Sequence, residues 1–198
     1  HAPPSASKTL RYQSKVFGLQ NLYAAPFDSF EKEDVETQLY LLNHRYQADD
    51  DQWVEVTGYY RNNQDDYDFN RFNPTAGNPF QHETEVLGGA IKGSQPLGEY
   101  ELLYGGEIYS DSITSTSLTF GPYDSQVLGS VSLAGRRSWE SGEGTWTALL
   151  GGVWDDSNRY EGEFLPVSRL QFAVNDEAGD GWEAFVDVSG ASQVPGYT

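Results

Sequence analysis

Apolar and polar residues alternate along most of this chain with a period of two, the pattern of β-strands that have one apolar and one polar face. The clearest run is YELLYGGEIY at 100–109. Its even positions, from Tyr100 to Ile108, are mainly aromatic and aliphatic, whereas Glu101 and Glu107 occupy odd positions. This run predicts a strand whose apolar face would contact lipid and whose carboxylates would point to the other side.

The same alternation recurs often enough to predict about nine strands. It is strong at 126–139 and 182–190 and weaker at 34–47, where several apolar residues are contiguous. The runs lie near 15–23, 34–47, 52–64, 83–94, 100–109, 126–139, 145–155, 166–174 and 182–190. Helical periodicity is almost absent between them.

The connections between these runs alternate between short and long. Short turns are predicted at 48–52, 94–98, 141–144 and 175–181, and long polar and aromatic connections at 24–33, 65–82, 110–125 and 155–165. In an antiparallel meander, the short turns would then share one end of the sheet and the long loops the other. Outer-membrane barrels show this asymmetry.

The pattern therefore predicts an all-β fold: an antiparallel up-and-down meander of about 8–10 strands that forms all or part of a transmembrane β-barrel. A soluble β-sandwich or a small closed β-barrel also alternates and remains the alternative. Residues 1–10, rich in Pro, Ser and Ala, are expected to be a flexible N-terminal segment, with the barrel over 11–198. Such a sheet is expected to curl toward closure, with its first and last strands near each other or paired across copies.

Composition narrows the function. The net charge of -18 disfavours binding to nucleic acid, because a phosphate backbone would be repelled and no basic cluster offsets the acids. The 14% aromatic residues argue against disorder. The absence of Cys excludes disulfides, thiolate catalysis and Zn–Cys sites. No apolar run is long enough for a transmembrane helix. A transmembrane β-strand needs only about ten residues of alternating character, so a membrane-spanning barrel is still compatible with the sequence.

Catalytic motifs are not found. The histidines are His1, His44 and His82, and no serine lies in a G-x-S-x-G motif. The chain is therefore predicted not to be an enzyme.

The segment DDYDFNRFNP, from Asp65 to Pro74, is the most unusual connection. Its aromatic and basic residues are candidates for ligand binding, and its carboxylates, with Asn70, are the best set for Ca²⁺, which prefers oxygen ligands. The alternative is an ordinary solvated loop, and the spacing of an EF-hand is lacking. The candidate ligand-binding residues are Tyr67, Phe69, Arg71 and Phe72, and the candidate metal ligands are Asp65, Asp66 and Asp68. Tyr67, with Tyr59 and Tyr60, is also expected near the membrane–water boundary.

Several segments in the same order resemble the barrel region of bacterial TonB-dependent outer-membrane receptors, especially the vitamin B12 receptor-like group. They are KVFGLQNLYAAPF (15–27), LLNHRY (41–46), YYRNNQDDYDFNRFNP (59–74), FQHETEV (80–86), STSLTFGPY (115–123), WDDSNR (154–159) and ASQVPGYT (191–198). The resemblance covers nearly the whole chain after residue 11.

This resemblance implies a section of a 22-stranded barrel in the bacterial outer membrane. It implies import of a scarce small-molecule nutrient, such as a siderophore–metal chelate or a corrinoid (cobalamin). The expected partners are that nutrient, outer-membrane lipid, and TonB through a plug domain absent from this chain. The alternative is a secreted soluble β-domain that binds carbohydrate through exposed aromatic residues. No resident cofactor is expected apart from Ca²⁺ in the loop.

Overall fold

The protein is a single antiparallel β-sheet, seen here in a computed structural model that describes residues 5–19, 31–70, 72–73, 79–117, 124–175 and 181–191. Nine strands follow one another in the sheet in the same order as in the sequence. They are β1 (Ser5–Leu19), β2 (Glu31–Gln47), β3 (Trp53–Asp68), β4 (Phe80–Leu97), β5 (Tyr100–Ser115), β6 (Ser125–Ser141), β7 (Gly144–Ser157), β8 (Tyr160–Asn175) and β9 (Gly181–Ser189). The predicted meander is confirmed, and no second sheet covers it in the described part of the chain.

Glycine shapes two of the hairpins. Leu97 pairs with Tyr100 across Gly98 and Glu99, and Ser141 pairs with Gly144 across Gly142 and Glu143. Gly98 and Gly142 have φ of 68° and 65°, a conformation that costs glycine little and that two-residue hairpins require. The turn between β2 and β3 is held by the Ala48 N–H, which donates to the Gln52 carbonyl at 2.9 Å.

These hairpins define one end of the sheet, called here the turn end, and the opposite end is called the loop end. At the loop end β3 is joined to β4, β5 to β6, and β7 to β8. The prediction that the short turns share one end of the sheet is thus confirmed for the turns that join β2 to β3, β4 to β5 and β6 to β7. The long connection predicted at 155–165 is wrong, because Ser157 pairs with Tyr160 across Asn158 and Arg159.

The strands are longer than the apolar alternation indicated. The first begins at Ser5 rather than near residue 15, β3 continues to Asp68, and β5 continues to Ser115. The added residues are mostly polar, and they still pair because ladder hydrogen bonds join backbone groups whatever the side chains are. The boundary expected between a flexible segment and the barrel near residue 10 stays a prediction.

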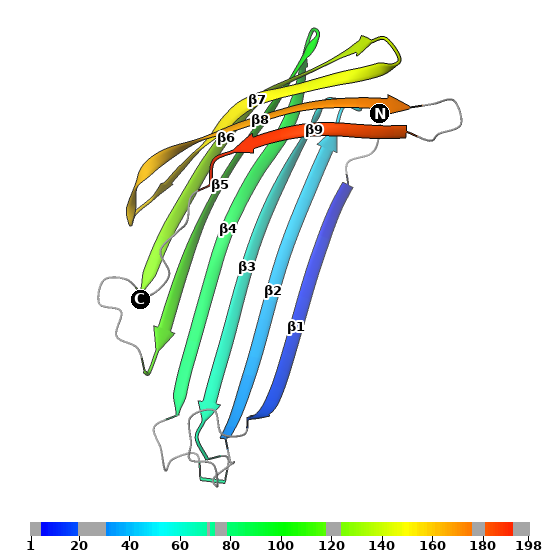
Figure 1. Cartoon of the computed structure of the whole chain (residues 1–198). Coiled ribbons are helices and arrows are strands. Elements are labelled where there is room, and N and C mark those ends of the chain that lie inside the picture. Colours follow the sequence, from blue (N-terminus) through cyan, green and yellow to red (C-terminus); the bar gives the residue numbers. More distant parts are fainter. Residues whose placement is uncertain are drawn as a thin grey trace.

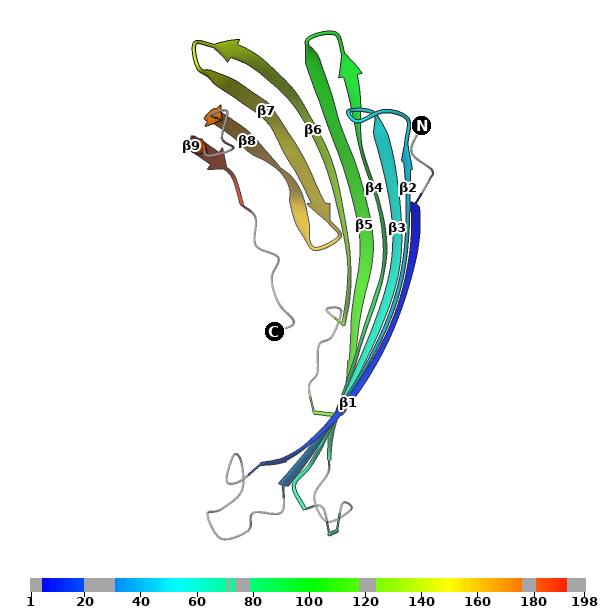
Figure 2. The ribbon, with the colours of Figure 1, turned by 90° about the vertical axis from the view of Figure 1, so that its right-hand side faces the viewer.

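The sheet is twisted, curved and open. In Figure 1, β1 to β4 run steeply while β8 and β9 cross the top of the view, and Figure 2 shows β9 and β1 on opposite sides. β1 and β9 end the strand order, so the prediction that they come together within one copy is wrong.

The molecule has almost no conventional core. Tyr67, Leu128 and Leu165 are the apolar side chains that are buried among the described residues. The remaining large apolar side chains are half-buried or exposed, as expected for one layer that meets its surroundings on both faces. The described residues include no helix long and apolar enough to span a membrane.

Candidate functional site

Strand register sorts the side chains into an apolar face and a polar face. Residues paired across an antiparallel ladder point to the same side, so the pairs Tyr40–Tyr60, Tyr60–Leu87 and Val131–Trp154 share the apolar face. The register also places the side of β5 that was predicted to be apolar on this face. It places Glu101 and Glu107 of β5 on the polar face. The predicted separation of the two faces is therefore confirmed.

The apolar face forms a continuous exposed band from β1 to β9. Leu150, at the middle of β7, is 74% exposed and Val186 on β9 is 68% exposed. The exposed members of the band are Leu10, Tyr12, Tyr40, Leu42, Tyr46, Val56, Leu87, Ile91, Leu97, Tyr100, Ile108, Val127, Val131, Leu133, Trp139, Leu150, Trp154, Phe164, Leu170, Trp182, Val186 and Val188. A water-soluble monomer rarely exposes so large an apolar surface.

Tyrosines border this band toward the loop end. The hydroxyl of Tyr60 donates to Glu85 at 2.6 Å, and that of Tyr12 donates to Glu36 at 3.3 Å. Tyr40, whose ring centroid lies 6.1 Å from that of Tyr60, donates to Gln38 at 3.4 Å. The strand register places each acceptor on the same face as its tyrosine but two residues closer to the loop end. The rings therefore lie in the apolar band while their hydroxyls reach the polar margin beyond it.

A second aromatic group borders the band toward the turn end, on β6 to β9. Trp139 stacks on Trp146 with ring centroids 6.5 Å apart, and Trp146 lies 4.8 Å from Phe172. Phe172 in turn meets the ring of Trp182 at 5.5 Å. These four residues, called here the turn-end aromatic row, give the band an aromatic margin at this end as well.

The polar face is crossed by ion pairs between neighbouring strands. Glu55 on β3 accepts from Lys92 on β4 at 2.9 Å. Glu101 on β5 accepts from the Nε of Arg136 on β6 at 2.7 Å. Arg45 also lies over the ring of Trp53, with its Cζ 4.1 Å from the ring centroid. Charges held in this way need water or polar partners, so this face suits an aqueous interior and not lipid.

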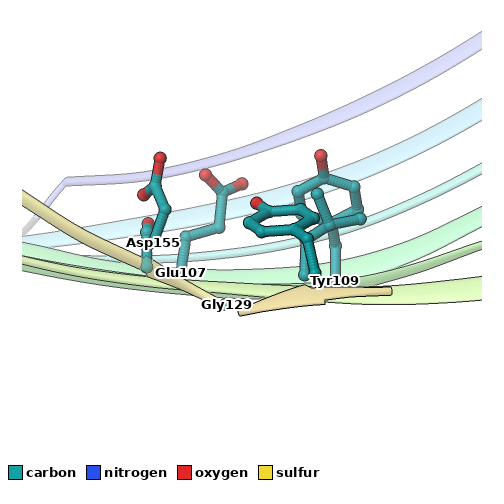
Figure 3. A pocket seen from close by; sticks show the side chains of 7 residues that line it. Glu107, Tyr109, Gly129 and Asp155 are labelled. Carbon is teal, nitrogen blue, oxygen red and sulfur yellow. The ribbon is translucent and has the colours of Figure 1, made fainter. Parts of the chain in front are cut away.

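A hollow on the polar face lies between β5 and β8, with a volume of about 190 Å³. It is lined by Glu107, Tyr109, Leu128, Gly129, Ser130, Asp155 and Tyr160. Figure 3 shows the labelled side chains of Glu107, Tyr109 and Asp155 standing on the same side of the sheet. Strand pairing shifts register between Asp155 and Ser157, and such irregularities redirect nearby side chains.

A glycine on β4 leaves room for the tyrosine side chain that forms a hydrogen bond with Glu107 of this hollow. Tyr59 on β3 donates to Glu107 on β5 at 2.7 Å, so its side chain crosses the intervening strand β4. It crosses at Gly88, where a Cβ would collide with the Tyr59 ring and with Tyr109. Tyr59 therefore lies on the polar face, as does Tyr67, and only Tyr60 fits the expected position at the membrane boundary.

The predicted ligand-binding residues are divided by the structure. Tyr67 is 6% exposed, and its ring lies 5.1 Å from Phe69 and 6.3 Å from Phe80. Phe72 is 75% exposed, and its N–H donates to the Asn70 side chain at 3.0 Å. Arg71 lies outside the described residues. Tyr67 and Phe69 thus pack together with Phe80, whereas the Phe72 side chain is accessible.

The predicted metal ligands are also separated. They all lie on β3 and not in a loop, and strand alternation puts Asp65 on the polar face and Asp66 and Asp68 on the apolar side. No group of three potential metal-ligating side chains occurs among the residues that the structure describes. The structure therefore does not bring these three carboxylates together.

Asp65 instead interacts with Glu33 on the neighbouring strand, beyond the apolar band. Burial and the adjacent Asp65 carboxylate raise the pKa of Glu33 above its usual value. On the other side of β2, a hydrogen bond to Asp34 raises the pKa of Lys32. Charged side chains therefore lie close together at the loop end of β2 and β3.

No motif in the sequence marks the hollow. Glu107 and Asp155 are far apart along the chain, and each looks like an ordinary polar position in a strand. The placement of Glu107 on the polar side of its strand was predictable, but its meeting with Asp155 depends on the register of two successive strand pairs, β5–β6 and β6–β7. Only the folded sheet brings them together.

Three solved structures are similar to this chain over part of their length. A structure described as copper transporter OprC matches 79% of this chain and 31% of its own, with 13% identity and a TM-score of 0.49. The ferric preacinetobactin receptor BauA from Acinetobacter baumannii matches 80% of this chain and 31% of its own, with 9% identity and a TM-score of 0.46. A bacterial polysaccharide outer membrane secretin matches 94% of this chain and 83% of its own, with 8% identity and a TM-score of 0.34.

The chain therefore spans about a third of the length of the first two proteins, 31% in each case. None of the three descriptions names a vitamin B12 receptor, the subgroup that the loop sequences resemble. The sequence matches no family model and no curated protein.

Proposed function

We propose that this chain forms part of the wall of a transmembrane β-barrel in the bacterial outer membrane. The apolar face would contact lipid and the polar face would line the barrel interior. The observation that carries this proposal is the broad exposed apolar face, which no second layer covers in the described structure. Lipid provides the apolar surroundings that such a face requires.

The dimensions of the band agree with this proposal. On β7, the apolar face extends from Trp146 to Trp154. At roughly 3.3 Å per residue and a tilt of roughly 40°, this distance spans about 20 Å of membrane thickness between Cα atoms. With the side chains added, it approaches the ~25 Å apolar band of outer-membrane barrels. The tyrosines at one margin and the turn-end aromatic row at the other would lie at the two membrane–water interfaces.

The transport role rests on the loop sequences. Their resemblance to TonB-dependent receptors supports import of a scarce nutrient, with a siderophore–metal chelate or a corrinoid as the candidate ligand class. Energy would come from TonB through a plug domain. Within the candidate ligand set, we take the exposed Phe72 as the ligand contact, because Tyr67 and Phe69 pack against each other and Phe69 against Phe80.

The lipid-facing assignment is tested by tryptophan fluorescence quenching. The 198-residue chain is inserted into vesicles of phosphatidylcholine brominated on its acyl chains, in variants that keep one tryptophan and replace the others by Phe. Trp146 and Trp154, on the apolar face, should be strongly quenched. Trp53, on the polar face beneath Arg45, is the matched control and should be quenched weakly. Equal quenching of all three would contradict the proposal.

The nutrient assignment needs a separate test. The detergent-solubilised chain is titrated with a panel of ferric siderophores and with cobalamin. Phe72→Ala is compared with His44→Ala, which changes the apolar face near the turn end, far from Phe72 along β2 and β3. Selective weakening by Phe72→Ala supports the ligand role. A chain that is monomeric in detergent-free buffer and binds glycans would instead support the soluble alternative.

A further inference from the structure

A hollow of about 350 Å³ lies on the apolar face where β5, β6 and β7 approach the turn end. Across its floor, Gly135 on β6 is opposite Leu150 on β7, and Ala148 on β7 is opposite Arg137 on β6. A Cβ added at Gly135 would meet no atom within 4 Å, so the space above this residue is open. The residues that line the hollow include Tyr100, Gly135, Arg137, Trp139, Ala148 and Leu150.

The lining changes from charged to apolar along the hollow. On β6, Trp139 belongs to the turn-end aromatic row, and Arg137 and Gly135 follow it on the same face toward the middle of the sheet. Leu150, opposite Gly135, lies at the middle of the apolar face of β7. A basic side chain in such a place extends its charged end toward the membrane surface. The hollow therefore has a polar end at headgroup depth and an apolar end at hydrocarbon depth, the order in which a phospholipid is built.

Two opposite charges form the polar end. The Nη2 of Arg137 donates to the Oε2 of Glu99, in the turn between β4 and β5, at 2.5 Å. The Cζ of Arg137 lies 5.3 Å from the centroid of the Tyr100 ring, at the side of the hollow. The Arg137 side chain is 42% exposed and that of Glu99 is 75% exposed. A guanidinium has several N–H donors and a carboxylate several acceptor positions, so both groups can bind a further partner while they remain paired.

A headgroup that carries both charges is complementary to this pair. The phosphate of phosphatidylethanolamine accepts hydrogen bonds and matches Arg137, and its primary ammonium donates them and matches Glu99. Phosphatidylglycerol has the phosphate but no cation, so Glu99 and the net charge of -18 oppose it. Phosphatidylcholine has a quaternary ammonium, which has no N–H to donate. Charge and hydrogen bonding thus favour phosphatidylethanolamine.

We propose, on the basis of the proposed membrane function, that this hollow binds one phosphatidylethanolamine molecule from the leaflet at the turn end. Arg137 binds the phosphate and Glu99 binds the ammonium. One acyl chain lies over Gly135 and Ala148 and against Leu150. The site is formed by three neighbouring strands and one turn, so it belongs to the folded sheet and not to a single segment.

Quenching of Trp139 by a minor lipid tests the site. The 198-residue chain, with Trp139 as its single tryptophan and the others replaced by Phe, is reconstituted in phosphatidylcholine vesicles. A small fraction of the lipid is then replaced by phosphatidylethanolamine, phosphatidylglycerol or phosphatidylcholine, each brominated on the upper part of its acyl chains. Quenching by brominated phosphatidylethanolamine should exceed that by the other two and should saturate. A variant with Trp182 alone, in the same aromatic row, is the matched control and should show no headgroup preference.

Substitutions of the charged pair test the two headgroup contacts separately. Arg137→Gln should lower the preference for phosphatidylethanolamine roughly fivefold, the effect expected of one basic residue near a membrane surface. Arg137→Lys should restore part of it. Glu99→Gln should abolish the preference over phosphatidylcholine and should increase quenching by phosphatidylglycerol. This increase is a gain of binding, which loss of folding does not produce.

The acyl-chain contact is tested by filling the hollow. Gly135→Leu should remove the excess quenching. The control is Gly106→Leu, which fills a second hollow on the same face, whose lining on that face is uncharged, and should leave the excess unchanged. Equal quenching of Trp139 by the three lipids, a preference for phosphatidylglycerol, or an equal loss in both glycine variants would overturn the inference.

Failure of this inference is distinguishable from failure of the membrane proposal. If Trp154 as the single tryptophan is quenched by brominated phosphatidylcholine but Trp139 shows no headgroup preference, the lipid site is wrong while the lipid-facing assignment stands. Absence of quenching at Trp154 contradicts the proposed function itself.

Discussion

At the scale of single residues, Gly88 shows how an absent side chain positions a distant one. The Tyr59 side chain lies over this glycine and reaches Glu107 two strands away. We expect Gly88→Ala to lower the free energy of unfolding by roughly 1–3 kcal/mol, because a methyl group would force the ring aside. Gly58→Ala is the control, since nothing lies within 4 Å of a Cβ there. Urea unfolding in detergent micelles measures both.

The bond itself is separated from the packing by Tyr59→Phe, which keeps the ring and removes the hydroxyl. This variant should lose about 1 kcal/mol. In the Gly88→Ala background the same change should cost less, because the ring is already displaced. Equal costs in the two backgrounds would show that the glycine does not position Tyr59.

Glu33 offers a prediction of pH dependence. Its pKa is raised in the folded protein by burial and by Asp65, so the folded state holds the proton more tightly than the unfolded state does. Its contribution is therefore fully present below the usual pKa of a glutamate and is lost as pH rises through the folded pKa. The stability of Glu33→Gln relative to the natural chain should rise with pH across this window. In an Asp65→Asn background the rise should be smaller.

At the scale of one element, β7 carries lipid-facing and interior-facing residues side by side. Leu150 lies at the middle of its apolar face, and Thr147 lies on the polar face of the same strand. Leu150→Arg should destabilise the lipid-inserted chain by about 2–4 kcal/mol, the cost of a cation near the bilayer midplane. Thr147→Arg should cost much less because water can reach it. Unfolding by urea from vesicles checks the pair, and equal costs would argue against a lipid-facing Leu150.

At the scale of the whole molecule, the open sheet predicts uneven protection of backbone amides. In detergent, alternate amides of β9 point away from β8 and should exchange with solvent rapidly. Amides of β4 and β5 have strands on both sides and should exchange slowly. Hydrogen exchange followed by mass spectrometry tests this. Slow exchange throughout β9 would indicate that its outer edge is paired after all.

The sequence by itself determined the number of strands, the up-and-down alternation of successive strands and the face on which each side chain lies. These follow from the period of two and from turn residues, which are local properties of the chain. Thus Leu102 and Glu101 could be assigned to opposite faces without knowing any neighbour. The strand ends were predicted less well, because Asn62 to Asp68 lack the apolar alternation yet extend the ladder with their backbone groups.

Only the tertiary structure decided which side chains meet. The Tyr59 bond to Glu107, the hollow beside Asp155 and the packing of Tyr67 on Phe80 depend on the register between strands that are far apart in sequence. The separation of Asp65 from Asp66 and Asp68 follows from the continuation of β3, which replaced an expected loop by a strand. That β1 and β9 do not pair with each other is likewise seen only in the assembled sheet. Local periodicity fixes which face each residue occupies, whereas register and curvature fix its neighbours, and these arise only when the strands assemble.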